Sequence, residues 1–235
     1  MHRFFSSSQL TEQLKLLSSD SRFHQILNVF RSKKGDIITF FEVGKDDSIY
    51  EITSINKKEI QLTKSGTIIK TNVSKSALRI FQSYPNKIST MEIIVQKMVE
   101  LWIPELSFFA SEHSQIREIS ENKKQRLESI ALEALEQSGN NIPIKILYID
   151  WKNTKDLLKE VDNKDVIIAC PEWKTVLNHS AISCASLWVG PEGGWSKTER
   201  DFFVENDIAH WSFNNGILRV ETASIVGAGI LNYLL

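Results

Sequence analysis

The sequence predicts an α/β protein in which a β-rich N-terminal part is followed by a larger part of alternating strands and helices. Short β-branched and aromatic runs separated by turn formers fill residues 1–75, which is typical of a small barrel or sandwich. After about residue 75, apolar residues at helical spacing alternate with short apolar runs, which favours a largely parallel sheet covered by helices. We therefore expect two domains, 1–75 and 76–235, with the turn-prone segment around Pro85 as the linker.

The first part contains runs with the composition of strands at residues 37–41, 49–52, 59–62 and 66–69. Clusters of Gly, Asp, Asn and Lys lie before and between them, and these residues favour turns. A helix is expected before the strands, near residues 21–30.

In the second part, helical spacing of apolar residues extends over 91–101 and 127–135, and Gly139 follows the latter as a helix stop. Runs that predict strands lie at residues 106–109, 144–148, 166–169 and 187–189. This alternation predicts a helix between most pairs of neighbouring strands in the sequence.

Charge is unevenly distributed along the chain. Residues 1–75 hold twelve Lys and Arg against eight Asp and Glu, whereas the remainder holds sixteen against twenty-one. The net charge of −1 argues against a chain that binds polyanions over its whole surface. A mildly basic first part beside a mildly acidic remainder indicates a division of labour, although solvated surfaces vary by this much without any function.

Two cysteines, Cys170 and Cys184, form neither a CxxC motif nor a Cys/His cluster, so we expect reduced thiols and no metal site. No apolar run reaches the ~18 residues that a membrane-spanning helix needs. The first residues, Met-His-Arg-Phe-Phe, lack the apolar core of a signal peptide. We expect a cytoplasmic protein without a membrane partner.

The most informative segment is the loop Gly190-Pro191-Glu192-Gly193-Gly194, which directly follows the apolar run 187–189. Glycines allow backbone amides to approach a ligand closely. Ser196 and Glu199 have the spacing of a capping box, which predicts a helix directly after the loop. A strand, a glycine loop and a helix form ligand sites in α/β sheets, although this loop is neither a Walker A motif nor GxGxxG. The alternative is a tight turn that binds nothing.

A second turn-prone loop, 214–216, lies between the strand-like residues 211–213 and an apolar helix that runs to Leu235. Arg219 and Glu221 are charged residues at the mouth of this helix. They are either a surface ion pair or the polar groups of a site shared with the first loop, and only the second interpretation explains both loops together.

The loop 190–194, followed by Leu218-Arg219-Val220-Glu221-Thr222-Ala223, resembles the paired motifs of the RsmE family, a group of SPOUT-class methyltransferases. Further stretches resemble this family in the same order, so the resemblance covers almost the whole chain: residues 3–5, 24–36, 96–101, 111–114 and 133–139. The chain departs from the family pattern at Phe30, Trp102, His113, Gly216 and residues 212–214. Of these departures, Gly216 and residues 212–214 concern the cofactor and substrate contacts more than the class of protein.

The resemblance implies an N-terminal PUA-like β-barrel and a C-terminal SPOUT α/β domain with a deep trefoil knot. It also implies S-adenosylmethionine as the cofactor and no metal. The implied reaction is methylation of N3 of a uridine (m3U1498 in the standard rRNA numbering) in 16S ribosomal RNA of the small subunit. A homodimer is implied as well. The apolar final helix would suit its interface, and an intramolecular core explains this helix equally well.

By motif position, the resemblance assigns cofactor contacts to Val189, Gly190, Pro191, Gly193, Gly194, Ser212, Phe213, Leu218, Thr222 and Ala223. Arg219 is expected to orient the uridine and to stabilise negative charge that develops on its carbonyl oxygens. Glu192 and Glu221 are candidates for orienting Arg219 or for accepting the N3 proton.

Contacts with RNA phosphates are expected mostly from the basic first domain. The candidate RNA-binding residues there are Arg3, Arg22, His24, Arg31, Lys33 and Lys34, and His113 and Arg117 add contacts from the second domain.

Two other functions remain open from the sequence. A catalytically inactive RNA-binding or ribosome-assembly factor would keep the basic domain without needing the two loops. A SPOUT methyltransferase could also act on another RNA site. A different nucleotide-binding enzyme, such as a dehydrogenase, is disfavoured because GxGxxG is missing.

Overall fold

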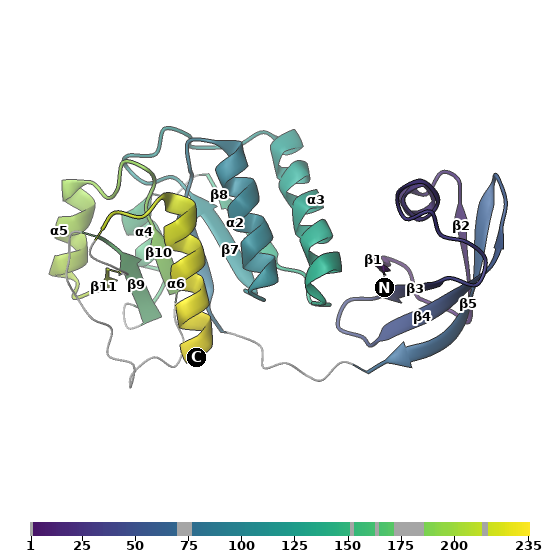
Figure 1. The fold of residues 1–235 in the computed structure, drawn as a ribbon. Coiled ribbons are helices and arrows are strands. Elements are labelled where there is room, and N and C mark those ends of the chain that lie inside the picture. Colours follow the sequence, from purple (N-terminus) through teal and green to yellow (C-terminus); the bar gives the residue numbers. More distant parts are fainter. Residues whose placement is uncertain (1, 70–76, 151–152, 163–164, 172–185, 213–215) are drawn as a thin grey trace. The chain divides into compact units, whose positions relative to one another are not determined.

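A computed structural model describes residues 2–69, 77–150, 153–162, 165–171, 186–212 and 216–235. The chain divides into two compact units, Met1–Val73 and Ser74–Leu235 (Figure 1). None of the helices that the structure describes has the length and apolar character needed to span a bilayer.

The first unit is built on a five-stranded sheet with the order β1-β3-β4-β5-β2. Its strands are β1 (His2–Phe5), β2 (Gln13–Leu17), β3 (Ile37–Phe41), β4 (Asp47–Ile55) and β5 (Glu59–Ile68). All neighbouring strands are antiparallel except β1 and β3. Two register shifts between β4 and β5 mark bulges, which bend and twist a sheet. The described strands form an open, half-barrel sheet with β1 and β2 at its edges.

The core of this unit comes from side chains on one face of the sheet, including Phe4, Phe40 and Tyr50. A helical segment covers it, formed by α1 (Ser21–His24) and the π-helix η1 (Gln25–Val29). The expected helix near 21–30 is thus confirmed. The two runs at 59–62 and 66–69 were expected to be separate strands, but residues 59–68 form the single strand β5.

The second unit contains a six-stranded sheet with the order β11-β9-β10-β6-β7-β8, in which every described pair is parallel. Its strands are β6 (Arg79–Ser83), β7 (Glu105–Phe109), β8 (Lys145–Ile149), β9 (Val166–Ala169), β10 (Ser186–Val189) and β11 (Ala209–Trp211). Its helices are α2 (Ile88–Glu100), α3 (Glu121–Ser138), α4 (Thr154–Leu158), α5 (Lys197–Glu205) and α6 (Val220–Leu234). The α/β class with a parallel sheet is confirmed.

Helices cover both faces of this sheet. Successive residues of a strand point to opposite faces, so neighbouring residues of β10 pack against different helices. Leu187 and Val189 of β10 pack into the core that holds α2, α3 and α6. Trp188, between them in sequence, packs on the other side with Phe203 of α5 and stacks on Phe81 at 4.1 Å between ring centroids. Both faces of β10 are therefore buried, which explains its continuous apolar run.

The strand order reverses within the sheet. From β6 the chain adds β7 and β8 on one side, and β9, β10 and β11 all lie on the other side of β6. Connections that leave in opposite directions open a crevice at the carboxyl ends of the strands, which is the usual ligand position in such sheets.

The segment around Pro85, expected to be the linker, lies inside the second unit as the connection between β6 and α2. The expectation was wrong because the preceding run, residues 79–83, is a strand of the large sheet and not of the first unit. The trefoil knot stays a prediction, since residues 172–185 and 213–215 lie outside the described residues.

Candidate functional site

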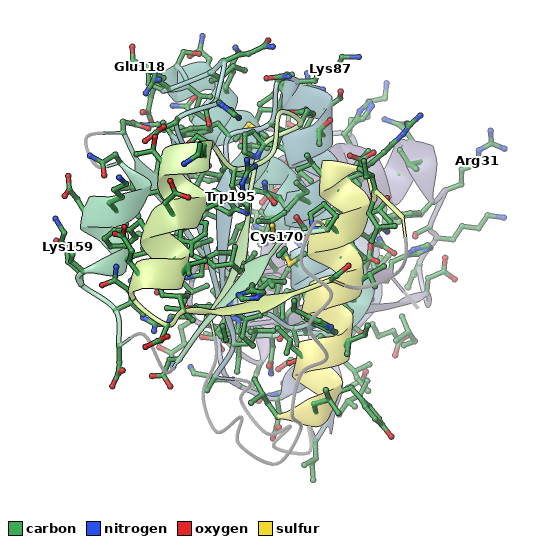
Figure 2. The ribbon with its side chains drawn as sticks, turned by 90° about the vertical axis from the view of Figure 1, so that its left-hand side faces the viewer. Arg31, Lys87, Glu118, Lys159, Cys170 and Trp195 are labelled. Carbon is green, nitrogen blue, oxygen red and sulfur yellow. The ribbon has the colours of Figure 1, made fainter. Side chains whose placement is uncertain are left out.

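A cavity of about 530 Å³ lies at the carboxyl ends of the strands, at the reversal of strand order. The ends of β9, β10 and β11 and the starts of α2 and α6 form its wall. Figure 2 shows Trp195 and Cys170 between α5 and α6, in the interior of this unit. The residues around the cavity are Asn86, Lys87, Thr90, Ala169, Cys170, Pro171, Val189, Gly190, Pro191, Glu192, Gly194, Trp195, Trp211, Ser212, Gly216, Ile217, Leu218, Arg219, Val220, Glu221 and Ala223.

The glycine loop enters the cavity wall through a tight turn. The Gly194 N–H donates to the Pro191 carbonyl at 2.9 Å, and Gly194 has a φ of +66°, a conformation that glycine adopts without a steric cost. No atom lies within 4 Å of the position that a Gly194 Cβ would take. A Cβ at Gly190 would lie only 3.2 Å from the indole ring of Trp195. The two glycines are thus required for different reasons, backbone conformation and close packing.

Trp195 anchors the end of this loop to the neighbouring strand. Its indole Nε1–H donates to the carbonyl of Ala169 at 2.9 Å, and its own carbonyl accepts a hydrogen bond from Arg200 at 2.7 Å. The ring is buried, so its N–H needs such a partner. The loop after β10 is therefore fixed to the end of β9.

Glu192 links the loop to the start of α2. Both of its carboxylate oxygens accept the backbone N–H of Asn86, at 3.0 and 3.1 Å. The Oδ1 atom of Asn86 is buried and has no hydrogen-bond partner among the described residues, although Asn86 lines the cavity.

A buried polar pair lies beneath the cavity, and the sequence analysis missed it. The Ser224 hydroxyl donates to the Gln82 Oε1 atom and also contacts the Val220 carbonyl at 3.0 Å. The Gln82 amide lies 3.4 Å from the carbonyl oxygens of Val189 and of Gly190. The pair therefore connects β6, the end of β10 and α6. The only sequence signal for it was polar residues inside an apolar strand and an apolar helix.

Arg219 and Glu221 both line the cavity at the start of α6, where Arg219 is the N-cap residue. The Arg219 side chain is exposed, and its carbonyl accepts the Ala223 N–H at 2.8 Å. Among the ion pairs of the described residues, none joins Arg219 to Glu221, so the surface ion pair considered from the sequence is not observed.

The described residues of the two segments expected to form one site do meet at this cavity. Of the expected cofactor residues, Val189, Gly190, Pro191, Gly194, Ser212, Leu218 and Ala223 line it. Thr222 and Gly193 are not among the lining residues, and Phe213 lies outside the described residues. Gly193 instead faces His113, because a Cβ at Gly193 would lie 3.2 Å from the His113 Cβ. The Nδ1–H of His113 donates to the Gly193 carbonyl at 3.0 Å.

Sequence reasoning missed the lining residues that come from other strand ends, above all Asn86, Lys87, Cys170 and Trp195. Cys170 is buried at the end of β9, and Cys184 lies outside the described residues. Within the described ranges, no three His, Cys, Asp or Glu side chains gather in a way that could hold a metal ion.

The expected RNA-binding residues fall into two groups. Arg3 bonds to the Asp47 carboxylate at 2.8 Å and stacks over the Phe41 ring at 3.5 Å, and Arg22 bonds to Asp20 at 2.6 Å. These two guanidinium groups thus have structural partners. The exposed group consists of His24, Arg31, Lys33 and Lys34 in the first unit and His113 and Arg117 in the second.

The exposed cations of the first unit lie close together in sequence. Arg31, Lys33 and Lys34 form no ion pair within the described part of the chain. The side-chain amide of Asn28 donates a hydrogen bond to the His24 Nδ1 atom at 2.7 Å.

The parallel sheet, its reversal of strand order and the cavity at that reversal define a ligand-binding α/β domain. Residues 71–232 match the family model described as an RNA methyltransferase domain, and the chain belongs to this family.

Two relatives similar to this chain are both named as ribosomal RNA small subunit methyltransferases. The chain is 28% identical over 220 residues to ribosomal RNA small subunit methyltransferase E 2 of Borreliella burgdorferi, covering 91% of this chain and 88% of that protein. It is 27% identical to ribosomal RNA small subunit methyltransferase E of Helicobacter pylori, covering 87% and 83%. The resemblance to the RsmE family is thereby confirmed.

A solved structure shares the fold over the whole chain. This is ribosomal RNA small subunit methyltransferase E of Neisseria gonorrhoeae bound to S-adenosyl methionine, with a TM-score of 0.83 and 24% identity. The match covers 100% of this chain and 98% of that one. It confirms the expected combination of an N-terminal β-domain and a C-terminal methyltransferase-like α/β domain.

Proposed function

We propose that the protein uses S-adenosylmethionine to methylate N3 of a uridine in 16S ribosomal RNA, at the position of m3U1498. The observation that carries the proposal is the cavity where the two glycine-bearing loops meet, with Arg219 at its mouth. The names of the relatives support small-subunit ribosomal RNA as the substrate class. The protein would act in the cytoplasm on the small ribosomal subunit.

The residues of the cavity fit this cofactor. A volume of about 530 Å³ lies in the range of ~300–1,000 Å³ that small-molecule sites occupy. Backbone groups and the apolar side chains of Val189, Leu218 and Ala223 suit a flat, uncharged adenine. The unpaired Oδ1 of Asn86 offers an acceptor to a donor group of the cofactor. When bound, S-adenosylmethionine supplies a methyl group that its sulfonium already activates.

Arg219 is the residue that we assign to the substrate. Its side chain is exposed at the cavity, with no ion pair among the described residues. A guanidinium there can orient the uridine and stabilise negative charge on the uracil carbonyl oxygens as the N3 proton leaves.

The two carboxylates have different roles in this proposal. Both carboxylate oxygens of Glu192 already accept the Asn86 N–H, so we assign Glu192 to positioning the loop. Glu221 lines the same cavity two residues after Arg219, and we assign to it the orientation of Arg219 or the acceptance of the proton. A proton acceptor must lie within hydrogen-bonding reach of the group it deprotonates, so this role requires the uracil N3 to enter the cavity beside Glu221.

RNA phosphates would be bound by the exposed cations Arg31, Lys33 and Lys34 of the first unit, with His113 and Arg117 from the second. We also propose a homodimer. The apolar side chains of Val226, Ile230 and Leu234 on α6 are 37%, 38% and 36% exposed, and a second copy of the chain would cover them.

To test this, the purified protein is incubated with S-adenosylmethionine and with either small ribosomal subunits or naked 16S RNA from a strain that lacks the gene. Mass spectrometry of the RNA fragments should show N3-methyluridine at one position. Binding of the RNA without methylation would favour an assembly factor, and a methyl group elsewhere would favour another target site.

A further inference from the structure

Glu199 is a fully buried carboxylate that the proposed chemistry does not use. It lies in the first turn of α5, directly after the glycine loop. Its Oε2 accepts the Ser196 N–H at 2.9 Å, and the Ser196 hydroxyl accepts the Glu199 N–H at 3.0 Å, so the capping box expected from the sequence is confirmed. A capping box needs only one carboxylate oxygen.

The second oxygen of Glu199 binds two other segments of the chain. Oε1 accepts the hydroxyl proton of Thr154, the first residue of α4, at 2.5 Å. It also accepts the backbone N–H of Glu112, in the loop between β7 and α3, at 3.1 Å. All three donors to the carboxylate are uncharged N–H or O–H groups. A buried carboxylate is costly unless such bonds satisfy it, and these three donors do so while joining the start of α5 to α4 and to the loop after β7.

The Glu112 contact leads back to the glycine loop. The next residue, His113, donates to the Gly193 carbonyl at 3.0 Å, and its Cβ lies 3.2 Å from the position that a Gly193 Cβ would take. On its other side the same loop is held by hydroxyls at the end of β6, because Ser83 Oγ lies 2.7 Å from both Ser111 Oγ and Ser114 Oγ. The loop 111–114 is therefore held between the end of β6 and Glu199.

Glu199 thus reaches the glycine loop by two routes. One is direct, through the backbone of Ser196 next to Trp195. The other passes through Glu112 and His113 to Gly193. The Gly190–Trp195 segment is held at both its middle and its end by one carboxylate.

We propose that Glu199 is a positioning residue of the cofactor site, which sets the shape of the glycine loop through Ser196 and through His113. The proposal rests on the proposed function, because it assumes that the cavity binds S-adenosylmethionine. Glu199 does not line the cavity, so its effect on the cofactor must pass through the loop.

The decisive variant is Glu199→Gln, which keeps the size of the side chain and removes one acceptor. Whichever way the Gln amide is turned, its NH2 group cannot accept a hydrogen bond. It then faces either the Ser196 N–H, or the Glu112 N–H and the Thr154 hydroxyl. We expect the Kd for S-adenosylmethionine, measured by calorimetry on the full chain, to rise roughly tenfold. We expect kcat at saturating cofactor to stay near that of the wild type, so that the loss appears in KM for the cofactor.

Ser196→Ala is the matched control at the same helix start. It removes only the hydroxyl half of the capping box and leaves all three donors to the Glu199 carboxylate in place, including the backbone N–H of residue 196 that forms the direct route. We expect a lower Tm and an unchanged Kd. If Glu199→Gln lowers Tm and leaves Kd unchanged, or if Ser196→Ala raises Kd as much as Glu199→Gln does, the role of Glu199 is only structural and the proposal is overturned.

A double-mutant cycle tests the route through His113. His113→Ala alone should weaken cofactor binding, and in the Glu199→Gln background it should add little, since residues in one network are not additive. Full additivity would overturn that route. If Glu199→Gln does not fold, Thr154→Val and His113→Ala carry the test, and wild-type Kd in either would overturn the proposal.

The same measurements separate this proposal from the proposed function. If the wild-type protein does not bind S-adenosylmethionine, the cofactor assignment itself fails. If the wild type binds and the Glu199→Gln variant binds equally well, only the positioning role fails.

Discussion

The carboxylate of Glu192 holds the backbone N–H of Asn86 with both oxygens, at 3.0 and 3.1 Å. This contact joins the loop after β10 to the loop after β6, across 106 residues of sequence. Lys87 follows Asn86 and lines the same cavity, so the contact lies at the start of the segment that leads into α2. The pair provides the first prediction.

Glu192→Gln keeps an acceptor for the Asn86 N–H and removes the charge. We expect the rate of methyl transfer to stay within about tenfold of the wild type, since positioning is preserved. Glu221→Gln should slow transfer by about 10² if it accepts the proton, in line with general acid–base contributions. Single-turnover kinetics over a range of pH compare the rate of methyl transfer in the two variants. An equally large loss in Glu192→Gln would place Glu192 in the proton transfer.

Arg219→Ala should slow methyl transfer by ~10²–10³ because it removes the cation that faces the developing uracil charge. Its exposed side chain has no partner among the described residues, so Tm and the Kd for S-adenosylmethionine should stay unchanged. Lys197→Ala is the control, an exposed cation of α5 paired with Asp201 outside the cavity wall. A variant at Arg219 with wild-type rate would remove this residue from the mechanism.

Gly194→Ala and Gly139→Ala form a matched pair. Both glycines have a left-handed backbone, with φ of +66° and +75°, and neither would place a Cβ within 4 Å of another atom. Each alanine variant should lower the free energy of unfolding by about 1–2 kcal/mol, as the strained backbone predicts. Only Gly194→Ala should also weaken binding of S-adenosylmethionine, because only Gly194 lines the cavity. Urea unfolding and calorimetry measure the two effects, and equal affinity in both variants would contradict the assignment.

Ser224→Ala should destabilise the second unit by about 1–3 kcal/mol, because it leaves the buried Oε1 of Gln82 without its donor. Ser129→Ala provides the comparison, since the Ser129 hydroxyl makes the same kind of bond to the carbonyl four residues earlier, at an exposed position of α3. That variant should stay within about 0.5 kcal/mol of the wild type. Equal losses in urea unfolding would show that the Gln82 contact adds nothing.

Tyr84 provides a prediction at alkaline pH. Burial raises the pKa of the Tyr84 phenol far above its ordinary value, and its hydrogen bond to the Asp150 carboxylate raises it further. The unfolded chain therefore loses this proton first, so the stabilisation is complete below about pH 10 and is lost as pH rises further. The unfolding free energy of the wild type should fall more steeply above that pH than that of Tyr84→Phe.

Urea unfolding between neutral and strongly alkaline pH measures this slope. Tyr233→Phe, at a ring that is 89% exposed, is the control and should have the slope of the wild type. Parallel curves for the wild type and Tyr84→Phe would show that the Tyr84 proton does not contribute.

Local patterns in the sequence determined most of the elements and one half of the site. The apolar periodicity placed α2 and α3, the Ser196–Glu199 spacing predicted the start of α5, and the 190–194 loop predicted a ligand site. These features depend on residues a few positions apart, which the sequence shows directly. The motif pair predicted that the loop would meet Arg219 and Glu221, and the cavity brings them together.

Only the tertiary structure decided the contacts between distant segments. Ser224 meets Gln82 across 142 residues, and Glu199 meets Thr154 and Glu112 across 45 and 87. Such contacts depend on the order of strands in the sheet, and periodicity reveals which face of a strand is buried but not which strand lies beside it. For the same reason residues 79–83 were assigned to no strand, and the linker was placed too late in the chain.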